Sequence, residues 1–338
     1  MNQSRTRIDL RPSKTANGGN IMKNNFMWTY YIRISQHISC DPTTPGFVLY
    51  IEPDWREEID TEEEAWDEII RFLPSQGINT VLIDILDGVR FDSHPEIAAP
   101  NAWSRDKLKE KLADIRALGM TPIPKFNFST AHSSWMKSYR RLTSTPVYYE
   151  LCKDLIDETC ELFDYPKYFH LGMDEEYPGN ERHLESMIIR NEQLFWHDWY
   201  FLFECCEKNG ARPWVWSDYA WKFPDLFEKH MPKSVVQSDW FYFRAYEGFT
   251  DPSGWDKCFN AFRRLEELGY DQIPTASTWN NGKCTEQVVA HCKNVVDESR
   301  LLGFATAAWY RTTMDDIYFL KHDAHRLCMA KNKFYPGT

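Results

Sequence analysis

A helix that ends in glycine, followed within a few residues by an apolar run, recurs along this 338-residue chain. A glycine just past a helix end adopts the left-handed conformation that closes the helix. Helix, glycine and buried strand in repetition are typical of βα units, which build a parallel sheet. The junctions are Gly77 before 79–85, Gly119 before 120–126, Gly210 before 212–217, Gly269 before 273–276 and Gly303 before 304–308.

Seven strands can be placed from this rhythm, and a helical pattern follows each of them. An eighth strand must precede the helix predicted over 61–73, and two segments could supply it. We favour 28–35, which leaves 36–60 as a long loop over the barrel mouth. The segment 47–52 lies nearer to the helix and is the alternative. The seven other strands are expected near residues 79–85, 120–126, 167–172, 212–217, 234–239, 272–277 and 303–308.

Several of the intervening helices carry start signals. Thr61 and Glu64 have the spacing of a capping box, and Ser104 and Thr145 stand where N-cap residues are favoured. Pro146 suits the first turn after Thr145. The helices are expected over residues 61–73, 107–118, 147–163, 181–209, 224–230, 252–268, 285–302 and 314–331.

Eight βα units within about 310 residues predict a single (β/α)8 TIM barrel of the α/β class. A doubly wound open sheet is the alternative fold. No linker or low-complexity segment interrupts the pattern. We therefore expect one barrel domain over 25–338, preceded by a flexible tail over 1–24.

Composition excludes several classes of protein. The formal net charge is −11, and lysine and arginine do not cluster, so a nucleic-acid partner is not expected. No apolar run is long enough to cross a membrane, and the polar start lacks the apolar segment of a secretory signal. The nine cysteines are scattered without a Cys-x-x-Cys pair, which favours free thiols in a reducing cytoplasm. Motifs for nucleotide or metal cofactors are absent, so we expect no cofactor.

The most distinctive stretch is 168–176, an apolar strand that ends in three consecutive acids. The carboxyl ends of barrel strands are where active sites lie. Neighbouring carboxylates repel each other, which can raise the pKa of one and make it an acid at neutral pH. Strand alternation puts Asp174 in phase with the barrel interior, and the turn that follows can redirect Glu175 into the mouth. We predict Asp174 and Glu175 as the catalytic pair, with Glu176 as the alternative member.

Acids and tryptophans recur at the carboxyl ends of the other predicted strands, whereas the amino ends carry ordinary residues. Acids that move protons and indoles that stack on sugar rings are what glycoside cleavage requires. Three candidates have other readings: Asp218 as a helix cap, His170 as a core histidine and His132 as a surface residue. The predicted substrate-binding residues are Arg90, His94, Asn127, His132, His170, Trp216, Asp218, Asp239, Trp240, Trp279, Trp309 and Tyr310.

The stretch from His170 to Glu175, His-Leu-Gly-Met-Asp-Glu, resembles the His-x-Gly-Gly-Asp-Glu signature of glycoside hydrolase family 20, the β-N-acetylhexosaminidases. The segment 214–218 is similar to the Trp-x-Asp segment on the fifth strand of that family. The segment 127–132 resembles its third-strand loop, which carries a site histidine. The closer likeness is to a poorly characterised bacterial group of family-20-like catalytic domains, and it spans most of residues 75–310, with its clearest matches at 93–97, 124–130 and 169–176.

The resemblance implies roles for the acid pair. In the family, the residue matching Asp174 orients the 2-acetamido group of the substrate, and the residue matching Glu175 protonates the departing oxygen. The acetamido oxygen attacks the anomeric carbon, so no protein nucleophile is needed. Met173 departs from the signature, which has glycine there. Tyr310 is the candidate for the tyrosine that helps to hold the acetamido group.

These residues predict an exo-acting retaining glycoside hydrolase that cleaves a terminal sugar, with an N-acetylhexosamine as the substrate that the resemblance implies. One alternative is a metal-dependent sugar isomerase or lyase, in which Asp84, Glu175, Asp218 and Asp239 ligate Mg²⁺ or Mn²⁺ through oxygen. The other is a non-catalytic sugar-binding barrel. All three readings share a carbohydrate as the partner.

Overall fold

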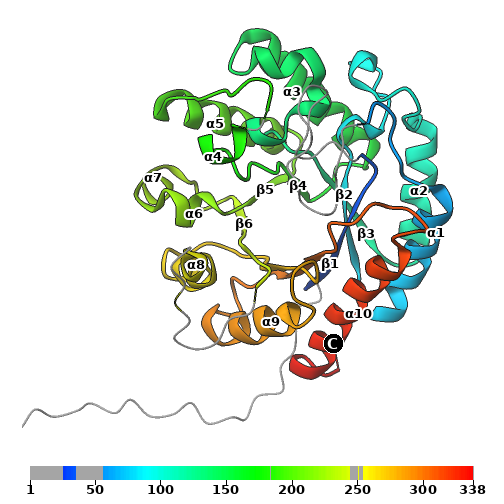
Figure 1. Ribbon diagram of the computed structural model, residues 1–338, viewed down its shortest axis with the longest axis vertical. Coiled ribbons are helices and arrows are strands. Elements are labelled where there is room, and N and C mark those ends of the chain that lie inside the picture. The colour runs from blue at the N-terminus through cyan, green and yellow to red at the C-terminus, as the bar shows by residue number, and fades with distance from the viewer. Residues whose placement is uncertain (1–25, 36–55, 183, 244–249, 251–253, 338) are drawn as a thin grey trace, which may run out of the picture.

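The computed structural model describes residues 26–35, 56–182, 184–243, 250 and 254–337. Parallel strands occupy the centre, and helices surround them (Figure 1). The strands follow each other in the order β6-β5-β4-β3-β2-β1-β9-β8-β7. This arrangement confirms the predicted (β/α)8 barrel. The strands are β1 (Met27–Arg33), β2 (Thr80–Asp84), β3 (Thr121–Lys125), β4 (Tyr168–His170), β5 (Arg212–Trp216), β6 (Val236–Ser238), β7 (Trp240–Phe241), β8 (Thr275–Ala276) and β9 (Gly303–Ala307).

The first barrel strand is the one that we favoured. In β1, Thr29 pairs with Thr80 of β2 on one side and with Ala305 of β9 on the other. The alternative segment 47–52 lies outside the described residues, as do the predicted tail and most of the predicted loop 36–60.

The sixth barrel strand is broken, which the sequence pattern did not predict. β6 pairs with β5 through Ser238 and Trp216, whereas β7 pairs with β8 through Trp240 and Thr275. Asp239 lies between the two pieces, and its carbonyl accepts a hydrogen bond of 2.8 Å from the Thr275 amide. One staggered strand therefore joins both edges of the sheet, so the nine strand segments fill eight barrel positions.

The outer helices are α1 (Glu63–Phe72), α2 (Arg105–Ala117), α3 (Pro146–Leu162), α4 (Pro178–Glu181), α5 (Glu192–Lys208), α6 (Tyr219–Lys222), α7 (Pro224–His230), α8 (Trp255–Glu267), α9 (Cys284–Val295) and α10 (Ile317–Phe334). Short 3₁₀ segments span Leu73–Gln76, Leu86–Gly88, Pro95–Ile97, Thr130–His132 and Ser134–Leu142. No helix among the described residues is long and apolar enough to cross a bilayer. The described cysteines are free thiols, and all but Cys328 are buried.

The predicted N-caps of two helices are confirmed. The Ser104 hydroxyl accepts a 3.1 Å bond from the Lys107 amide, and the Thr145 hydroxyl accepts one from the third residue of α3. The predicted capping box was wrong, because α1 begins at Glu63 after Glu62 and has no side-chain cap. The Thr61 hydroxyl instead donates to the Ile34 carbonyl at 2.7 Å, which ties the start of α1 to the end of β1.

Two predicted helices were too long. The segment 181–209 divides into the end of α4, an irregular stretch and α5, because the irregular stretch turns Arg190 inward to ion-pair with Glu176. Asn191 then starts α5 by accepting a 2.9 Å bond from the Leu194 amide. The helix predicted over 285–302 ends early, at Val295.

A buried ion pair fills the barrel interior near the strand ends. The Lys125 ammonium lies 2.8 Å from the Asp84 carboxylate, and the two side chains are 2% and 1% exposed. The Tyr31 hydroxyl donates to the same carboxylate oxygen at 2.6 Å. These side chains come from three adjacent strands, so the pair joins them, and a buried charge is tolerated there because its partner neutralises it.

We predict that Asp84→Asn lowers the free energy of unfolding by about 3 kcal/mol, because it leaves the Lys125 charge buried without its partner. The double variant Asp84→Asn/Lys125→Met should recover part of that loss. Glu204→Gln removes an exposed partner of Lys208 and should change stability by less than about 0.5 kcal/mol. Urea unfolding measures all three. Equal effects of the buried and the exposed substitution would contradict the prediction.

Candidate active site

The chain beyond β4 turns through residues with left-handed backbone conformation. The φ angles are 71° at Gly172, 72° at Met173 and 60° at Glu175. This conformation costs a residue with a side chain about 1–2 kcal/mol. Such strain persists only where surrounding contacts enforce it, and it concentrates at functional sites. The turn redirects the chain within four residues.

Asn127 supplies the contact that fixes this turn. A Cβ at Gly172 would lie 2.3 Å from the Asn127 Oδ1 atom, so only glycine fits there. The same Oδ1 accepts a 3.1 Å bond from the Met173 amide. On its other side, Asn127 Nδ2 donates to Asp174 Oδ1 at 2.8 Å. One side chain from the end of β3 therefore holds both the backbone of the turn and its first carboxylate.

The two consecutive carboxylates converge on one imidazole. His132 Nε2 lies 3.6 Å from Asp174 Oδ2 and 3.3 Å from Glu175 Oε2. The Asp174 side chain is 14% exposed and that of Glu175 is 33% exposed. The Glu175 amide donates to Asp218 Oδ2 at 2.9 Å. Asn127, His132 and Asp218 thus all contact the predicted pair, and the contact with solvent is greater for Glu175.

The third acid of the run points elsewhere. Glu176 accepts bonds from the Arg190 Nε atom at 2.8 Å and from the Thr130 amide at 3.0 Å. Arg190 also contacts Asp198 at 2.7 Å, and all three of these charged side chains are buried. Glu176 is therefore committed to a structural ion-pair cluster, and it does not join the acid pair.

Two further aspartates lie at neighbouring strand ends with altered acidity. Burial raises the pKa of Asp218 well above its ordinary value, and the negative charge of Asp174 adds to the effect. Burial also raises the pKa of Asp239, whose Oδ1 accepts a 3.1 Å bond from the Trp221 indole. Perturbed carboxyl groups gathered at one end of a barrel are typical of an active site.

Aromatic rings lie beside the acids. The Trp309 ring centroid lies 4.8 Å from that of Tyr31, 6.0 Å from Trp216 and 6.1 Å from Tyr242. Trp309 has a φ of 60°, so the chain bends at the point where this ring is presented. Trp240 stacks beneath Tyr242, with centroids 5.1 Å apart. Trp216, Trp240 and Trp309 therefore belong to one aromatic cluster.

Tyr242 was not among the residues predicted from the sequence. Burial raises the pKa of the Tyr242 phenol, and the negative charge of Asp174 raises it further. The phenol therefore lies in the electrostatic field of the acid pair. The signal that could have found it is its position two residues after Trp240, on the same side of an extended chain. Tyr310, the predicted candidate, instead stacks on Phe319 with centroids 4.4 Å apart.

His170 lies in the barrel interior beneath the turn. Its Nδ1 accepts a 3.0 Å bond from the Gly172 amide, and its ring packs 4.3 Å from that of Trp216. Burial, together with the Lys125 charge, lowers the pKa of the imidazole well below its ordinary value. The ring is therefore neutral near pH 7, and it supports the turn from below. Trp279, beyond β8, is half-buried.

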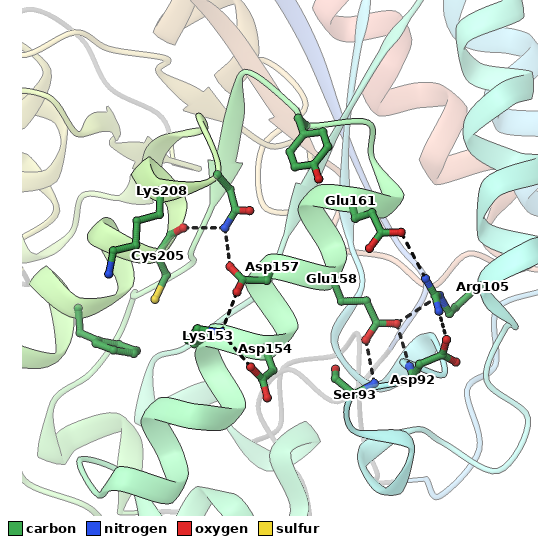
Figure 2. Close-up of a pocket in the computed structure, with 13 residues that line it drawn as sticks. Asp92, Ser93, Arg105, Lys153, Asp154, Asp157, Glu158, Glu161, Cys205 and Lys208 are labelled. Carbon is green, nitrogen blue, oxygen red and sulfur yellow. Dashed lines mark hydrogen bonds and ion pairs between the residues drawn. The ribbon is translucent and has the colours of Figure 1, made fainter.

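Two predicted ligands come from the chain beyond β2. Arg90 is exposed. His94 faces Glu96 at 3.0 Å and Asp154 of α3 at 3.5 Å. Asp154 also helps to line a surface hollow of about 630 Å³ on the helix layer. Figure 2 shows the residues that line this hollow. Its charges are largely paired with one another, as between Arg105 and Glu158 at 3.2 Å, so they form a surface ion-pair network.

The acid pair also offers a metal-binding geometry. Ligand atoms of His132, Asp174 and Glu175 all lie within 4.8 Å of one another, which suits a divalent cation. The metal ligands that the sequence suggested were Asp84, Glu175, Asp218 and Asp239. Asp84 is engaged by Lys125 and Tyr31, so it does not join a metal site with Glu175.

The comparisons with known proteins concern the fold. No protein-family model matches the sequence, and no curated protein matches it. Solved structures do: an exo-β-N-acetylglucosaminidase of glycoside hydrolase family 20 from Vibrio harveyi, in complex with N-acetylglucosamine, superposes with a TM-score of 0.60 at 15% identity. That match covers 90% of this chain and 54% of the Vibrio chain, so this chain spans about half of its length.

Two other structures give the same result. A β-N-acetylhexosaminidase from Bacteroides fragilis matches with a TM-score of 0.58 and 14% identity, over 90% of this chain and 65% of that one. Dispersin B matches with a TM-score of 0.55 and 13% identity, over 82% of this chain and 96% of that one. The chain therefore has the barrel fold of the family 20 glycoside hydrolases, as the resemblance implied.

We predict that Gly172→Ala is more damaging than Gly210→Ala. Both glycines have positive φ, of 71° and 75°, but a Cβ at Gly210 meets nothing within 4 Å. Gly210→Ala should therefore cost only the backbone strain of about 1 kcal/mol, and Gly172→Ala at least about 2 kcal/mol more, because Asn127 must move. Urea unfolding of the pair measures the difference. Equal losses would show that Asn127 does not fix the turn.

We predict that Asp239→Asn stabilises the protein at alkaline pH. Because burial raises the pKa of Asp239 in the folded protein, the protonated carboxyl adds stability to the wild type below its ordinary pKa of about 4. This stability is lost as pH rises through the pKa of the folded state. Asparagine keeps the acceptor for Trp221 and carries no charge. The melting temperature of the variant relative to wild type should therefore increase from pH 4 to pH 8. A difference that is constant or falls with pH would contradict this.

Proposed function

We propose that this protein is an exo-acting, retaining glycoside hydrolase that removes a terminal N-acetylhexosamine. The observation that supports it is the convergence of Asp174 and Glu175 on His132 at the carboxyl end of a family-20-like barrel. The similar structures are named as β-N-acetylglucosaminidases and β-N-acetylhexosaminidases, which favours the same substrate class here. The partner of the site is therefore a carbohydrate.

Glu175 is the proposed general acid and base. Breaking a glycosidic bond requires a proton on the departing oxygen, and a positioned carboxyl group supplies it. Glu175 suits this role because its side chain is the more exposed of the pair, while its amide is held by Asp218 at 2.9 Å. His132, 3.3 Å from Glu175 Oε2, is placed to restrain the carboxyl group.

Asp174 is proposed to act on the substrate's own acetamido group. Asn127 Nδ2 already donates a hydrogen bond to Asp174 Oδ1. Asp174 Oδ2 can therefore accept a hydrogen bond from the acetamido N–H. The acetamido carbonyl oxygen then attacks the anomeric carbon while the aglycone leaves with the proton of Glu175. Water opens the resulting oxazolinium ring at the anomeric carbon and returns a proton to Glu175. Two inversions leave the anomeric configuration retained.

The aromatic cluster is proposed to bind the terminal sugar. Trp309, which is half-buried, offers a flat face for the apolar side of a pyranose ring, and the buried Trp216 packs against it. Tyr242 presents a hydroxyl in the field of Asp174. Asp218 and Asp239 lie at the adjoining strand ends and can bind sugar hydroxyls. Protonated carboxyls, which their raised pKa values favour, can both donate and accept such bonds.

We predict that Glu175→Gln lowers kcat on an aryl β-N-acetylglucosaminide by about 10²- to 10⁴-fold. The loss should be much smaller with a dinitrophenyl leaving group, which departs without a proton. Asp174→Asn should slow both substrates, because it impairs the acetamido attack. Glu185→Gln, at an exposed ion pair with Arg141, is the matched control and should retain full activity. Unchanged turnover in Glu175→Gln would remove it from the mechanism.

The alternatives give different results in the same assay. Wild type should cleave the 2-acetamido substrate far faster than the matched 2-hydroxy glucoside, because only the former carries the internal nucleophile. Chelation should leave the rate unchanged. Loss of turnover on chelation, restored by Mg²⁺ or Mn²⁺, would favour metal-dependent chemistry at His132, Asp174 and Glu175. Sugar binding without turnover would favour a binding barrel.

A further inference from the structure

Four rings form two pairs beyond β9, and the rings are parallel within each pair. The two pairs are nearly perpendicular, because the Tyr318 and Phe319 planes lie 77° apart, with centroids 5.5 Å apart. Tyr310 stacks on Phe319 with centroids 4.4 Å apart and planes 8° apart. Tyr318 lies parallel to His322, with centroids 6.1 Å apart and planes 7° apart. Tyr318 and Phe319 are 69% and 40% exposed, which is unusual for adjacent large aromatic residues. We call Tyr310, Tyr318, Phe319 and His322 the aromatic shelf.

The shelf adjoins the proposed site through the chain itself. Trp309 and Tyr310 are consecutive residues beyond the carboxyl end of β9, so their Cα atoms are about 3.8 Å apart. Trp309, with its φ of 60°, turns to Trp216 and Tyr242, whereas Tyr310 turns to Phe319 in the first turn of α10. One segment therefore presents one ring to the acid-pair region and the next ring to the shelf. Figure 1 shows α10 leaving the barrel beside α9.

The shelf is uncharged. Burial lowers the pKa of His322, and the charges of Arg326 and His325 lower it further, so its ring is neutral near pH 7. The nearby cations are occupied, since Arg326 pairs with Glu286 at 2.8 Å and Arg311 with Asp316 at 2.9 Å. Flat, neutral rings, three of which carry a polar edge, match the face of a pyranose ring, which is apolar at its C–H groups and ringed by hydroxyls. A charged ligand would find no complementary group on these four side chains.

We propose that the aromatic shelf is an outlying subsite that stacks on the inner sugar units of an uncharged glycan whose terminal unit lies at the acid pair. The proposal rests on the proposed function, and it extends the substrate class from a single glycoside to a chain of sugars. The shelf contributes affinity for long substrates and takes no part in bond cleavage. Its loss should therefore weaken binding of polymer and leave hydrolysis of small aryl glycosides unaltered.

The test uses affinity electrophoresis in native gels that contain soluble glycol chitin. Glu175→Gln provides the background, so that hydrolysis does not erode the polymer. Adding Tyr318→Ala and Phe319→Ala should weaken the retardation by at least about fivefold, because each ring contact contributes a few-fold in affinity. Tyr165→Ala removes a ring that is 63% exposed, in the loop between α3 and β4, and it should leave the retardation unchanged. Melting temperatures check that all variants fold.

The outcomes separate this proposal from the proposed function. Hydrolysis of an aryl N-acetylglucosaminide by the Tyr318→Ala/Phe319→Ala protein at the wild-type rate, together with lost retardation, supports the shelf. The proposal is overturned if glycol chitin does not retard the Glu175→Gln protein, or if the shelf substitutions leave the retardation unchanged, even when wild type cleaves the aryl substrate. Concentration-dependent dimerisation that disappears in the shelf variant would also overturn it, because the shelf would then be covered by a second copy.

Discussion

The close approach of Asn127 to Gly172 determines where the two carboxylates lie. A side chain on residue 172 would overlap the Asn127 amide, and the same amide receives the Met173 N–H and binds Asp174. With that contact in place, the chain must turn through left-handed conformations between β4 and Glu175. Successive residues of an extended strand point to opposite faces, so without this turn Asp174 and Glu175 would diverge. Their convergence on His132 depends on it.

The strained turn is supported from three sides. His170 accepts the Gly172 N–H from inside the barrel, and Asp218 accepts the Glu175 N–H from the next strand. Glu176, bound to the buried Arg190, anchors the chain directly after the turn. These contacts over-determine the conformation, which is how a folded protein maintains a backbone that costs free energy locally. The departure of Met173 from the family-20 signature is accommodated in the same way, since its φ of 72° is enforced by its neighbours.

The barrel and the convergence of Asp174 and Glu175 at one strand end were predictable, whereas the contacts that support the turn were not, and the catalytic role of the two acids stays a prediction. The junctions between helix, glycine and strand can be predicted because glycine is favoured where a helix ends. The position of the candidate site can be predicted because active sites of barrels lie at the carboxyl ends of the strands. The break at Asp239 was missed because it arises from pairing with two different strands, which a local pattern does not encode. The helix predicted through Arg190 failed for a similar reason, since tertiary ion pairs override helical periodicity. His94 was placed by sequence order after β2, yet its partners come from α3 and its own loop.

The most direct test of the account is a crystal structure of the protein with N-acetylglucosamine bound. The account predicts that one sugar contacts both acids, with the acetamido nitrogen within hydrogen-bond distance of Asp174 Oδ2 and the anomeric oxygen within that distance of Glu175. The indole of Trp309 should lie against the ring. A sugar bound to only one of the two carboxylates, or bound away from both, would contradict the claim that the left-handed turn builds a single catalytic pair.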